Sequence, residues 1–123
     1  MNDRQMIELA IIFYPRAPSG GDQATPQLTG LHYRPHVVMG DPAQREPKLK
    51  SDGRTIDEDY LGIAFSAGPD VVCVGDEVRA EAALVYWPDV DYSKVVPGST
   101  FTVREGPFVV GHGRIIRRWE KAG

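Results

Sequence analysis

The three histidines and the serines are the residues whose chemistry could support a metal site or a catalytic triad. His32 and His36 are four residues apart, which in an extended strand separates them by roughly 13 Å. His112 lies alone between Gly111 and Gly113. We therefore expect no metal site, and the sequence has no nucleophile-elbow pattern that would predict a Ser-His-Asp triad.

The remaining reactive groups also favour structural roles. Cys73 is the only cysteine, which excludes an internal disulfide and a multi-thiolate metal site. Its neighbours Val71, Val72 and Val74 form an apolar run, so we predict a buried thiol in a short strand. The acidic run 57–59 is predicted to be a solvated loop. We expect no catalytic residue, no cofactor and no enzymatic activity.

Two arginines stand in extended stretches. Arg34 precedes a proline, where its guanidinium could bind a phosphate or pair with an acidic neighbour, and we favour the acidic neighbour. Arg104 and Glu105 are adjacent in a strand and point to opposite faces, so they cannot work together as an acid/base pair. For Glu105 two roles stay open, hairpin structure and ligand contact.

The C-terminal segment is locally basic because of Arg114, Arg117 and Arg118. Strand alternation places Arg114 and Arg118 on one face and Arg117 on the other. These arginines form either a small phosphate-contacting patch or the charged surface of an edge strand, and we favour the second. Trp87 and Trp119 either anchor a partner or close the barrel ends.

Length and composition indicate one domain over residues 1–123. Hydrophobic residues make up 41% and charged residues 25% of the 123 residues, which is ordinary for a globular protein. The formal net charge of -3 gives the whole molecule no attraction for polyanions. Apolar runs are far too short for a membrane span and no signal peptide is readable, so we expect a cytoplasmic protein.

The elements that must position these side chains are strands. Glycines and prolines separate β-rich runs, and helical signals are nearly absent. Ile7, Leu9 and Ile11 alternate toward a core, whereas Thr102 and Arg104 are predicted to point outward. Residues 42–59 form an inserted surface loop. The predicted strands cover residues 5–14, 30–39, 60–65, 71–74, 77–87, 99–105 and 108–119.

About six antiparallel strands of this kind can avoid exposed edges by closing into a barrel. Gly111 and Gly113 lie two apart on one face of the last strand, where missing side chains allow a sharp bend or a close backbone approach. This spacing is typical of a barrel corner. We predict an all-β closed barrel.

Three motifs carry a family resemblance. The segment 101–116 reads FTVREGPFVVGHGRII, the segment 33–36 reads YRPH, and Gly75-Asp76 opens an alternating strand. Together they resemble the C-terminal barrel, the third domain, of bacterial elongation factor Tu. The family patterns are roughly F-x-[IV]-R-E-G-x-x-x-V-G-x-G-x-[IV], Y-R-P-Q and G-D-x-[IV]. Their order and distances agree over most of the chain, from about Met6 to Trp119.

This resemblance implies a closed six-stranded antiparallel Greek-key barrel of the elongation factor Tu C-terminal domain type. It implies contacts with tRNA or a protein partner at Arg34, His36, Arg104 and Glu105. His36 replaces a glutamine of the family, and the 42–59 loop is longer than its counterpart. The chain has no phosphate-binding loop of the GTPase type, so GTP is not an expected ligand.

Two functions follow from these observations. The three-motif match favours a non-catalytic binding module that contacts tRNA or a translation-related protein. The alternative is a small protein-interaction domain, such as an inhibitor, immunity protein or assembly factor, unrelated to translation. The acidic total charge and the inserted 42–59 loop favour this alternative.

Overall fold

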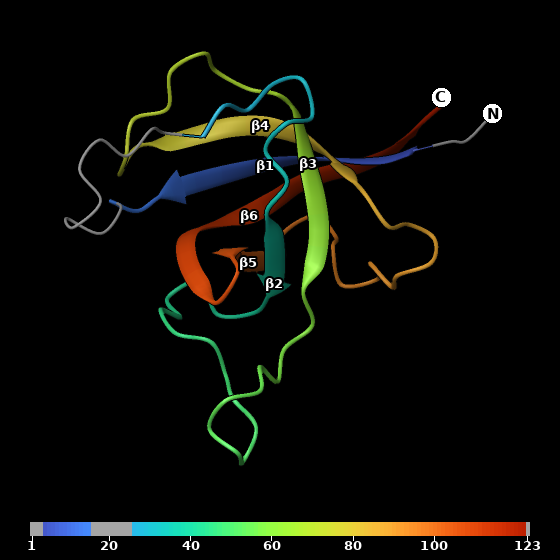
Figure 1. Ribbon diagram of the computed structural model, residues 1–123. Coiled ribbons are helices and arrows are strands. Elements are labelled where there is room, and N and C mark those ends of the chain that lie inside the picture. The colour runs from blue at the N-terminus through green and yellow to red at the C-terminus, as the bar shows by residue number, and fades with distance from the viewer. Residues whose placement is uncertain (1–3, 16–25, 123) are drawn as a thin grey trace.

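The computed structural model describes residues 4–15 and 26–122, and these form an all-β structure (Figure 1). The described residues contain no helix long and apolar enough to cross a membrane. The six strands are β1 (Arg4–Phe13), β2 (His36–Met39), β3 (Leu61–Ala67), β4 (Glu77–Leu84), β5 (Thr100–Glu105) and β6 (Phe108–Lys121).

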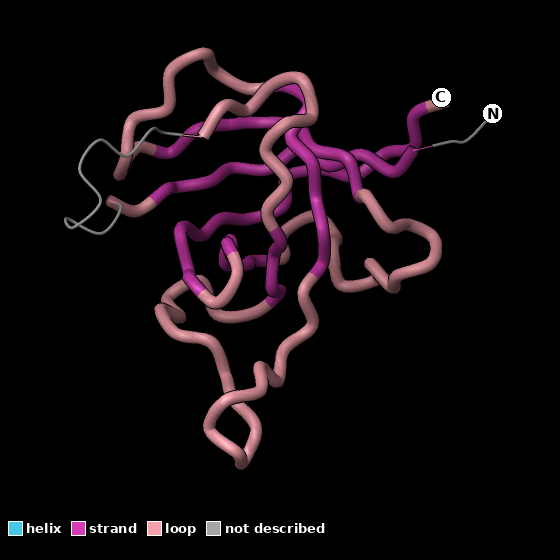
Figure 2. Tube along the Cα trace, in the orientation of Figure 1, coloured by secondary structure: helices cyan, strands magenta, loops and turns pink. Residues whose placement is uncertain are grey.

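The strands close into a barrel (Figure 2). Their order around it is β1-β4-β3-β2-β5-β6, with β6 pairing back to β1, and every pair is antiparallel. Strands β2, β3 and β4 follow one another, and β1 lies beyond β4, which is a Greek-key arrangement read against the chain direction. The prediction of a closed six-stranded antiparallel barrel is confirmed.

The core is built from the residues that alternate along each strand. The predicted inward residues of β1, namely Ile7, Leu9 and Ile11, are all buried, and so is Phe13 on the same face. They pack with Phe65 of β3 and Phe101 of β5 in one hydrophobic cluster. Burial of these side chains is the main stabilising contribution to the barrel.

Two glycines of β6 allow the barrel to bend sharply. A Cβ atom on Gly113 would lie 2.1 Å from the carbonyl oxygen of Ala10, and one on Gly111 would lie 2.7 Å from that of Ile12. Both contacts are with backbone atoms, so no side-chain rearrangement could relieve them. The predicted close backbone approach at these glycines is confirmed.

The segment 71–74 is a loop between β3 and β4, not a strand. Val72 alone turns into the core, whereas Val71 is 73% exposed and Cys73 is exposed. Gly68 and Gly75 lie on either side of this segment, and none of the six described strands pairs with it. The prediction of a buried Cys73 is therefore wrong.

The predicted strand 30–39 is regular only over β2. Before it, the carbonyl oxygens of Tyr33 and Pro35 accept hydrogen bonds from the amides of Phe65 and Ile63, both at 3.1 Å. The chain thus follows β3 without regular strand geometry. Arg34 lies in this irregular stretch.

The loop 42–59 accounts for an error in the predicted burial of β5. Thr102 and Arg104 were expected to face solvent, but both are buried on the outer side of the barrel. The base of the loop packs over them, while its tip projects away from the barrel (Figure 1). An isolated bridge between Leu49 and Ile56 closes the tip. None of the residues of the loop 42–59 is fully buried, so it lies at the surface as predicted, although the Glu58 side chain turns inward.

Candidate functional site

The candidate site is built around the buried Arg104 on β5, where the loop 42–59 packs on the barrel. Its Nη1 and Nη2 atoms donate to the two carboxylate oxygens of Glu58 at 2.7 and 3.1 Å. Its Nε donates to the hydroxyl of Thr102 at 2.9 Å, and Nη1 also reaches the hydroxyl of Tyr60 at 3.3 Å. The Arg104 side chain is 0% exposed and that of Glu58 is 4% exposed. This two-pronged bond fastens the loop 42–59 to the barrel.

Glu58 is held as a carboxylate by several donors. Burial acts to raise its pKa, but hydrogen bonds from Arg104, Gln44 and the amide of Lys48 outweigh that effect and lower the pKa to about 2. Gln44 donates at 2.8 Å and the Lys48 amide at 3.0 Å. The prediction that the run 57–59 is uniformly solvated is wrong at Glu58.

The other residues implied by the resemblance do not form one site. His36 pairs with Arg104 across β2 and β5, and its ring lies 5.6 Å from that of Tyr60. Glu105 accepts a 2.5 Å hydrogen bond from the hydroxyl of Tyr33. Arg34 is exposed and donates to the carbonyl oxygen of Leu31 at 2.9 Å. The predicted pairing of Arg34 with an acidic side chain is therefore not the contact that holds it.

The structure therefore brings His36 and Arg104 together and leaves Arg34 elsewhere. Arg104 has no exposed surface for a ligand, because Glu58 and Thr102 occupy its donors. Its side chain is therefore covered in this structure, and its role as a contact residue stays a prediction.

The C-terminal arginines are engaged by neighbouring strands. Arg114 forms a 2.5 Å salt bridge with Glu77, and Arg117 forms one at 2.7 Å with Glu8. Arg118 turns inward at the end of the barrel and donates to carbonyl oxygens of the 85–99 loop. These contacts partly neutralise the predicted basic patch.

The predicted faces of these arginines need correction. The register between β1 and β6 shifts at Glu8 and Leu9, which pair with Arg117 and Ile115 and leave Ile116 as an extra residue. This β-bulge reverses the alternation beyond it. Arg114 and Arg117 therefore share the outer face, while Arg118 lies on the face of Ile7.

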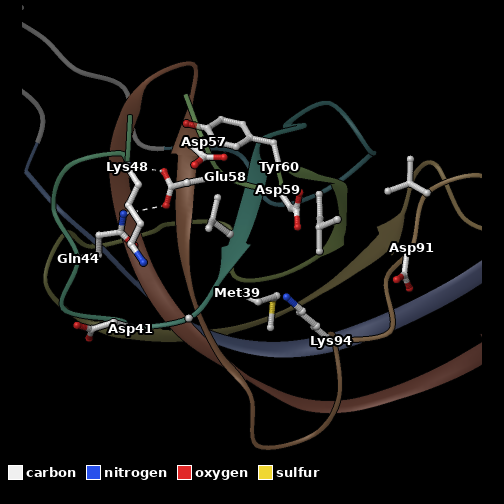
Figure 3. A pocket seen from close by; sticks show the side chains of 14 residues that line it. Met39, Asp41, Gln44, Lys48, Asp57, Glu58, Asp59, Tyr60, Asp91 and Lys94 are labelled. Carbon is white, nitrogen blue, oxygen red and sulfur yellow. Dashed lines mark hydrogen bonds between the residues drawn. The ribbon is translucent and has the colours of Figure 1, made fainter. Parts of the chain in front are cut away.

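A groove of about 490 Å³ lies beside the Arg104–Glu58 pair, between the loops 42–59 and 85–99 (Figure 3). Its apolar lining comes from Val38, Met39, Leu61 and Val90. Its charged lining consists of Asp41, Asp57, Glu58, Asp59, Asp91, Lys48 and Lys94. The groove thus combines an apolar floor with a predominantly acidic rim.

Two of the rim carboxylates are fixed by the chain around them. The Oδ1 of Asp41 accepts the amide of Ala43, and that of Asp91 accepts the amide of Ser93, both at 2.8 Å. The bonds from Ser93, with a smaller effect of Lys94, hold the pKa of Asp91 below its usual value. The Asp91 carboxylate therefore stays charged at neutral pH, and the backbone hydrogen bonds hold both aspartates in a fixed orientation.

The loop 85–99 forms the opposite wall and is anchored by Tyr92. The buried Tyr92 hydroxyl donates to the carbonyl oxygen of Gly62 at 2.6 Å and accepts the amide of Tyr86 at 3.2 Å. Both walls of the groove are therefore fastened to the barrel by buried side chains.

A second groove, of about 610 Å³, has a different character. Arg4 and Arg34 line it together with Gln5, Trp87 and Asp89. Trp87 is only partly buried, so part of its indole is accessible. Guanidinium groups beside an aromatic face can bind anions or stacked bases.

Tyr14 and His112 form another polar contact, next to Arg45 of the loop 42–59. The Tyr14 hydroxyl lies 2.6 Å from Nδ1 of His112, and the guanidinium of Arg45 stands 4.3 Å from the Tyr14 ring centroid. Burial, with a smaller effect of Arg45, lowers the pKa of His112. A neutral imidazole here orients the tyrosine, and Arg45 adds a second attachment for the loop 42–59.

Within residues 4–15 and 26–122, no group of three or more histidine, cysteine, aspartate or glutamate side chains could hold a metal ion. The buried polar side-chain atoms of this part all have hydrogen-bond partners. The arrangement can therefore orient and bind a ligand in a groove.

Sequence reasoning missed Glu58, Tyr60 and Lys94. Glu58 is 46 residues from its partner Arg104, and no local pattern connects them. The one available signal was Arg104 itself, a charged residue next to Thr102 in a strand otherwise rich in apolar residues. Such a residue requires a partner if anything covers it.

No protein-family model, no curated protein and no solved structure matches this chain.

Proposed function

We propose that this protein is a non-catalytic protein-binding module. The observation that carries the proposal is the groove of about 490 Å³ between two loops that buried side chains fasten to the barrel. Loops on a rigid scaffold are where binding surfaces are usually found, and a preformed groove loses little conformational freedom on binding.

The charges of the groove support binding rather than catalysis. A general acid or base needs a pKa near the working pH. The pKa values of Glu58 and Asp91 are shifted the other way, below their usual values. Carboxylates of this kind serve as fixed charges.

The engaged arginines support a protein partner over an RNA partner. Arg104 is buried against Glu58, and Arg114 and Arg117 face Glu77 and Glu8. Each neutralised arginine removes a phosphate contact that RNA binding would need. The chemistry of the groove is compatible with a protein partner from the translation apparatus and equally with one unrelated to translation.

Capture of partners from a cell lysate, with and without nuclease, tests the proposal. Lys94 is exposed at the centre of the groove, so Lys94→Trp should fill it, while Lys50→Trp alters the exposed loop tip and serves as the control. We expect a nuclease-resistant protein to bind the original protein and the control, and not Lys94→Trp. Complexes that all disappear with nuclease would contradict the proposal.

A second candidate function is contact with tRNA, as the resemblance to elongation factor Tu implies. The groove that contains Arg34, Arg4 and Trp87 favours it, because it offers cationic groups beside an accessible indole. Electrophoretic titration with tRNA at low salt is the test. A shift that Arg34→Ala weakens supports this function, and no shift at low salt contradicts it.

We further propose that the barrel is of the elongation factor Tu C-terminal domain type. In support, the motif 33–36 leads into β2, Gly75-Asp76 precedes β4, and 101–116 spans the hairpin of β5 and β6. An experimental structure superposed on that domain would test the proposal strand by strand. A different strand order would contradict it.

A further inference from the structure

We propose that the groove beside the 42–59 loop binds an extended segment of a partner protein in which lysine or arginine alternates with apolar residues. This inference rests on the proposed function and adds the chemistry of the partner.

The charge balance of the groove favours a cationic occupant. Glu58 is neutralised by Arg104, which leaves the carboxylates of Asp41, Asp57, Asp59 and Asp91 against the ammonium groups of Lys48 and Lys94, a net charge of -2. None of these four aspartates forms a salt bridge with another residue of the described chain. Their charges are available to a partner.

The alternation of the 57–59 run explains how these charges reach the groove. Glu58 points inward to Arg104 and is nearly inaccessible, so Asp57 and Asp59 on either side of it remain exposed. The buried pair therefore fixes the register of the run. Asp91 stands on the opposite loop, so the carboxylates flank the groove from two sides (Figure 3).

The apolar floor of the groove favours an occupant that has apolar side chains as well as positive charge. Met39 and Lys94 point toward its middle, and Val38, Leu61 and Val90 add apolar surface (Figure 3). A methionine thioether adapts to differently shaped apolar side chains. A hydrophilic cation would leave this floor unused, whereas an extended segment that alternates basic and apolar side chains can use the floor and the rim together.

Lys94 gives the inference a test that misfolding cannot imitate. Figure 3 shows its ammonium group beside Met39, within the groove that the aspartates line, where it repels a basic occupant. Lys94→Gln removes that repulsion and should increase affinity, while Asp59→Asn and Asp91→Asn should decrease it. A variant that fails to fold cannot bind more tightly.

The probe is a fluorescein-labelled eight-residue peptide that alternates lysine with leucine, measured by anisotropy at 50 and 300 mM NaCl. We expect binding that weakens with salt. At 50 mM we expect about a two- to fivefold gain for Lys94→Gln and about a two- to fivefold loss for each aspartate variant. Asp70→Asn, which changes an exposed carboxylate outside the groove, should leave the affinity unchanged.

Comparison peptides define the outcomes that would overturn the inference. A peptide with glutamate in place of lysine, and an octalysine peptide without leucine, should bind more weakly. Equal binding of octalysine would mean that the groove recognises charge alone. No effect of Lys94→Gln or the aspartate variants would mean that the peptide binds elsewhere. If these peptides fail while Lys94→Trp still abolishes lysate capture, the proposed function stands and this inference falls.

Discussion

Arg104 and Glu58 form a buried charged pair on the outer side of the barrel, where the sequence pattern predicts solvent-exposed residues. The pair is nearly inaccessible, with side chains 0% and 4% exposed. A buried pair of this kind contributes modest net stability when intact, because its desolvation costs free energy, but the loss of one partner leaves a buried charge uncompensated.

Glu58→Gln should therefore lower the free energy of unfolding by about 3 kcal/mol, as measured by urea denaturation. The control is Glu77→Gln, which breaks the Arg114 salt bridge between side chains that are each 47% exposed, and it should cost less than about 1 kcal/mol. The double variant Arg104→Met/Glu58→Met removes both charges and should be more stable than Glu58→Gln. Equal small losses at both pairs would show that water screens Arg104 despite its burial.

The same carboxylate predicts how stability responds to acid. Hydrogen bonds lower the pKa of Glu58 in the folded protein to about 2, against an ordinary 4.5 when unfolded. A lowered folded pKa means that the ionised group stabilises the fold above pH 4.5, and that this contribution is lost as pH falls toward 2. Denaturation at pH 7, 5, 4 and 3 should show the difference in stability between the original protein and Glu58→Gln shrinking below pH 5.

A constant difference at all four values would contradict the assignment. Asp52 has a pKa lowered to about 2 by bonds from Thr55 and Arg54, so it also titrates in this range. Because Asp52 is present in both proteins, its effect cancels in the comparison.

At the residue scale, local sequence patterns predicted the direction in which a side chain points better than whether that side chain is buried. Arg104 was recognised as an outward residue of β5, and its direction is right, but no local pattern could show that a loop 46 residues away covers it. Cys73 was assigned to a buried strand because its neighbours are apolar, although only Val72 among them is buried. Apolar character alone does not decide which residues of a short loop turn inward.

At the element scale, the bend in β6 depends on glycine. Gly113→Ala would bring a Cβ within 2.1 Å of the Ala10 carbonyl oxygen, so β1 and β6 would have to separate. We expect a loss of about 3 kcal/mol in urea denaturation. Adding Ala10→Gly should not restore stability, because the obstructing atom belongs to the backbone. Rescue by Ala10→Gly would contradict this account.

The strand pair β2–β3 has the fewest paired residues of the six strand pairs in the barrel. Only His36 with Gly62 and Val37 with Leu61 pair there, whereas β1 is paired along its length with β4 and β6. Regions with few ladder contacts open at lower free energy. In amide hydrogen exchange we expect Ile63 and Phe65, which bond to the irregular stretch before β2, to exchange faster than Ile7, Leu9 and Ile11. Uniform protection would indicate a barrel that opens only as a whole.

Element prediction succeeded where hydrophobic periodicity was strong. The alternation in 5–14, 77–87 and 108–119 predicted β1, β4 and β6 with small errors at the ends. The short β2 was overestimated because its preceding residues are extended without regular pairing. The groove was beyond such reasoning, since it arises from two loops whose positions depend on the distant anchors Glu58 and Tyr92.

At the scale of the whole molecule, the distribution of charge matters more than its total. The formal net charge of -3 already disfavours polyanions, yet Arg114 and Arg117 share an outer face that could meet phosphates if Glu77 and Glu8 did not occupy them. The acidic partners on β1 and β4 thus act as built-in competitors for any phosphate.

Removing those competitors should create affinity for a polyanion. Glu8→Gln/Glu77→Gln raises the formal net charge from -3 to -1, frees Arg114, and leaves Arg117 with the longer 3.9 Å contact to Glu81. We expect binding of labelled poly(U) to strengthen about tenfold at 50 mM NaCl, with a log-log salt slope more negative by about 2. The control Asp70→Asn/Glu46→Gln makes the same change of net charge at exposed carboxylates away from β6, and should have a much smaller effect. Equal gains in both variants would mean that total charge, and not the masking of Arg114 and Arg117, keeps this surface from binding nucleic acid.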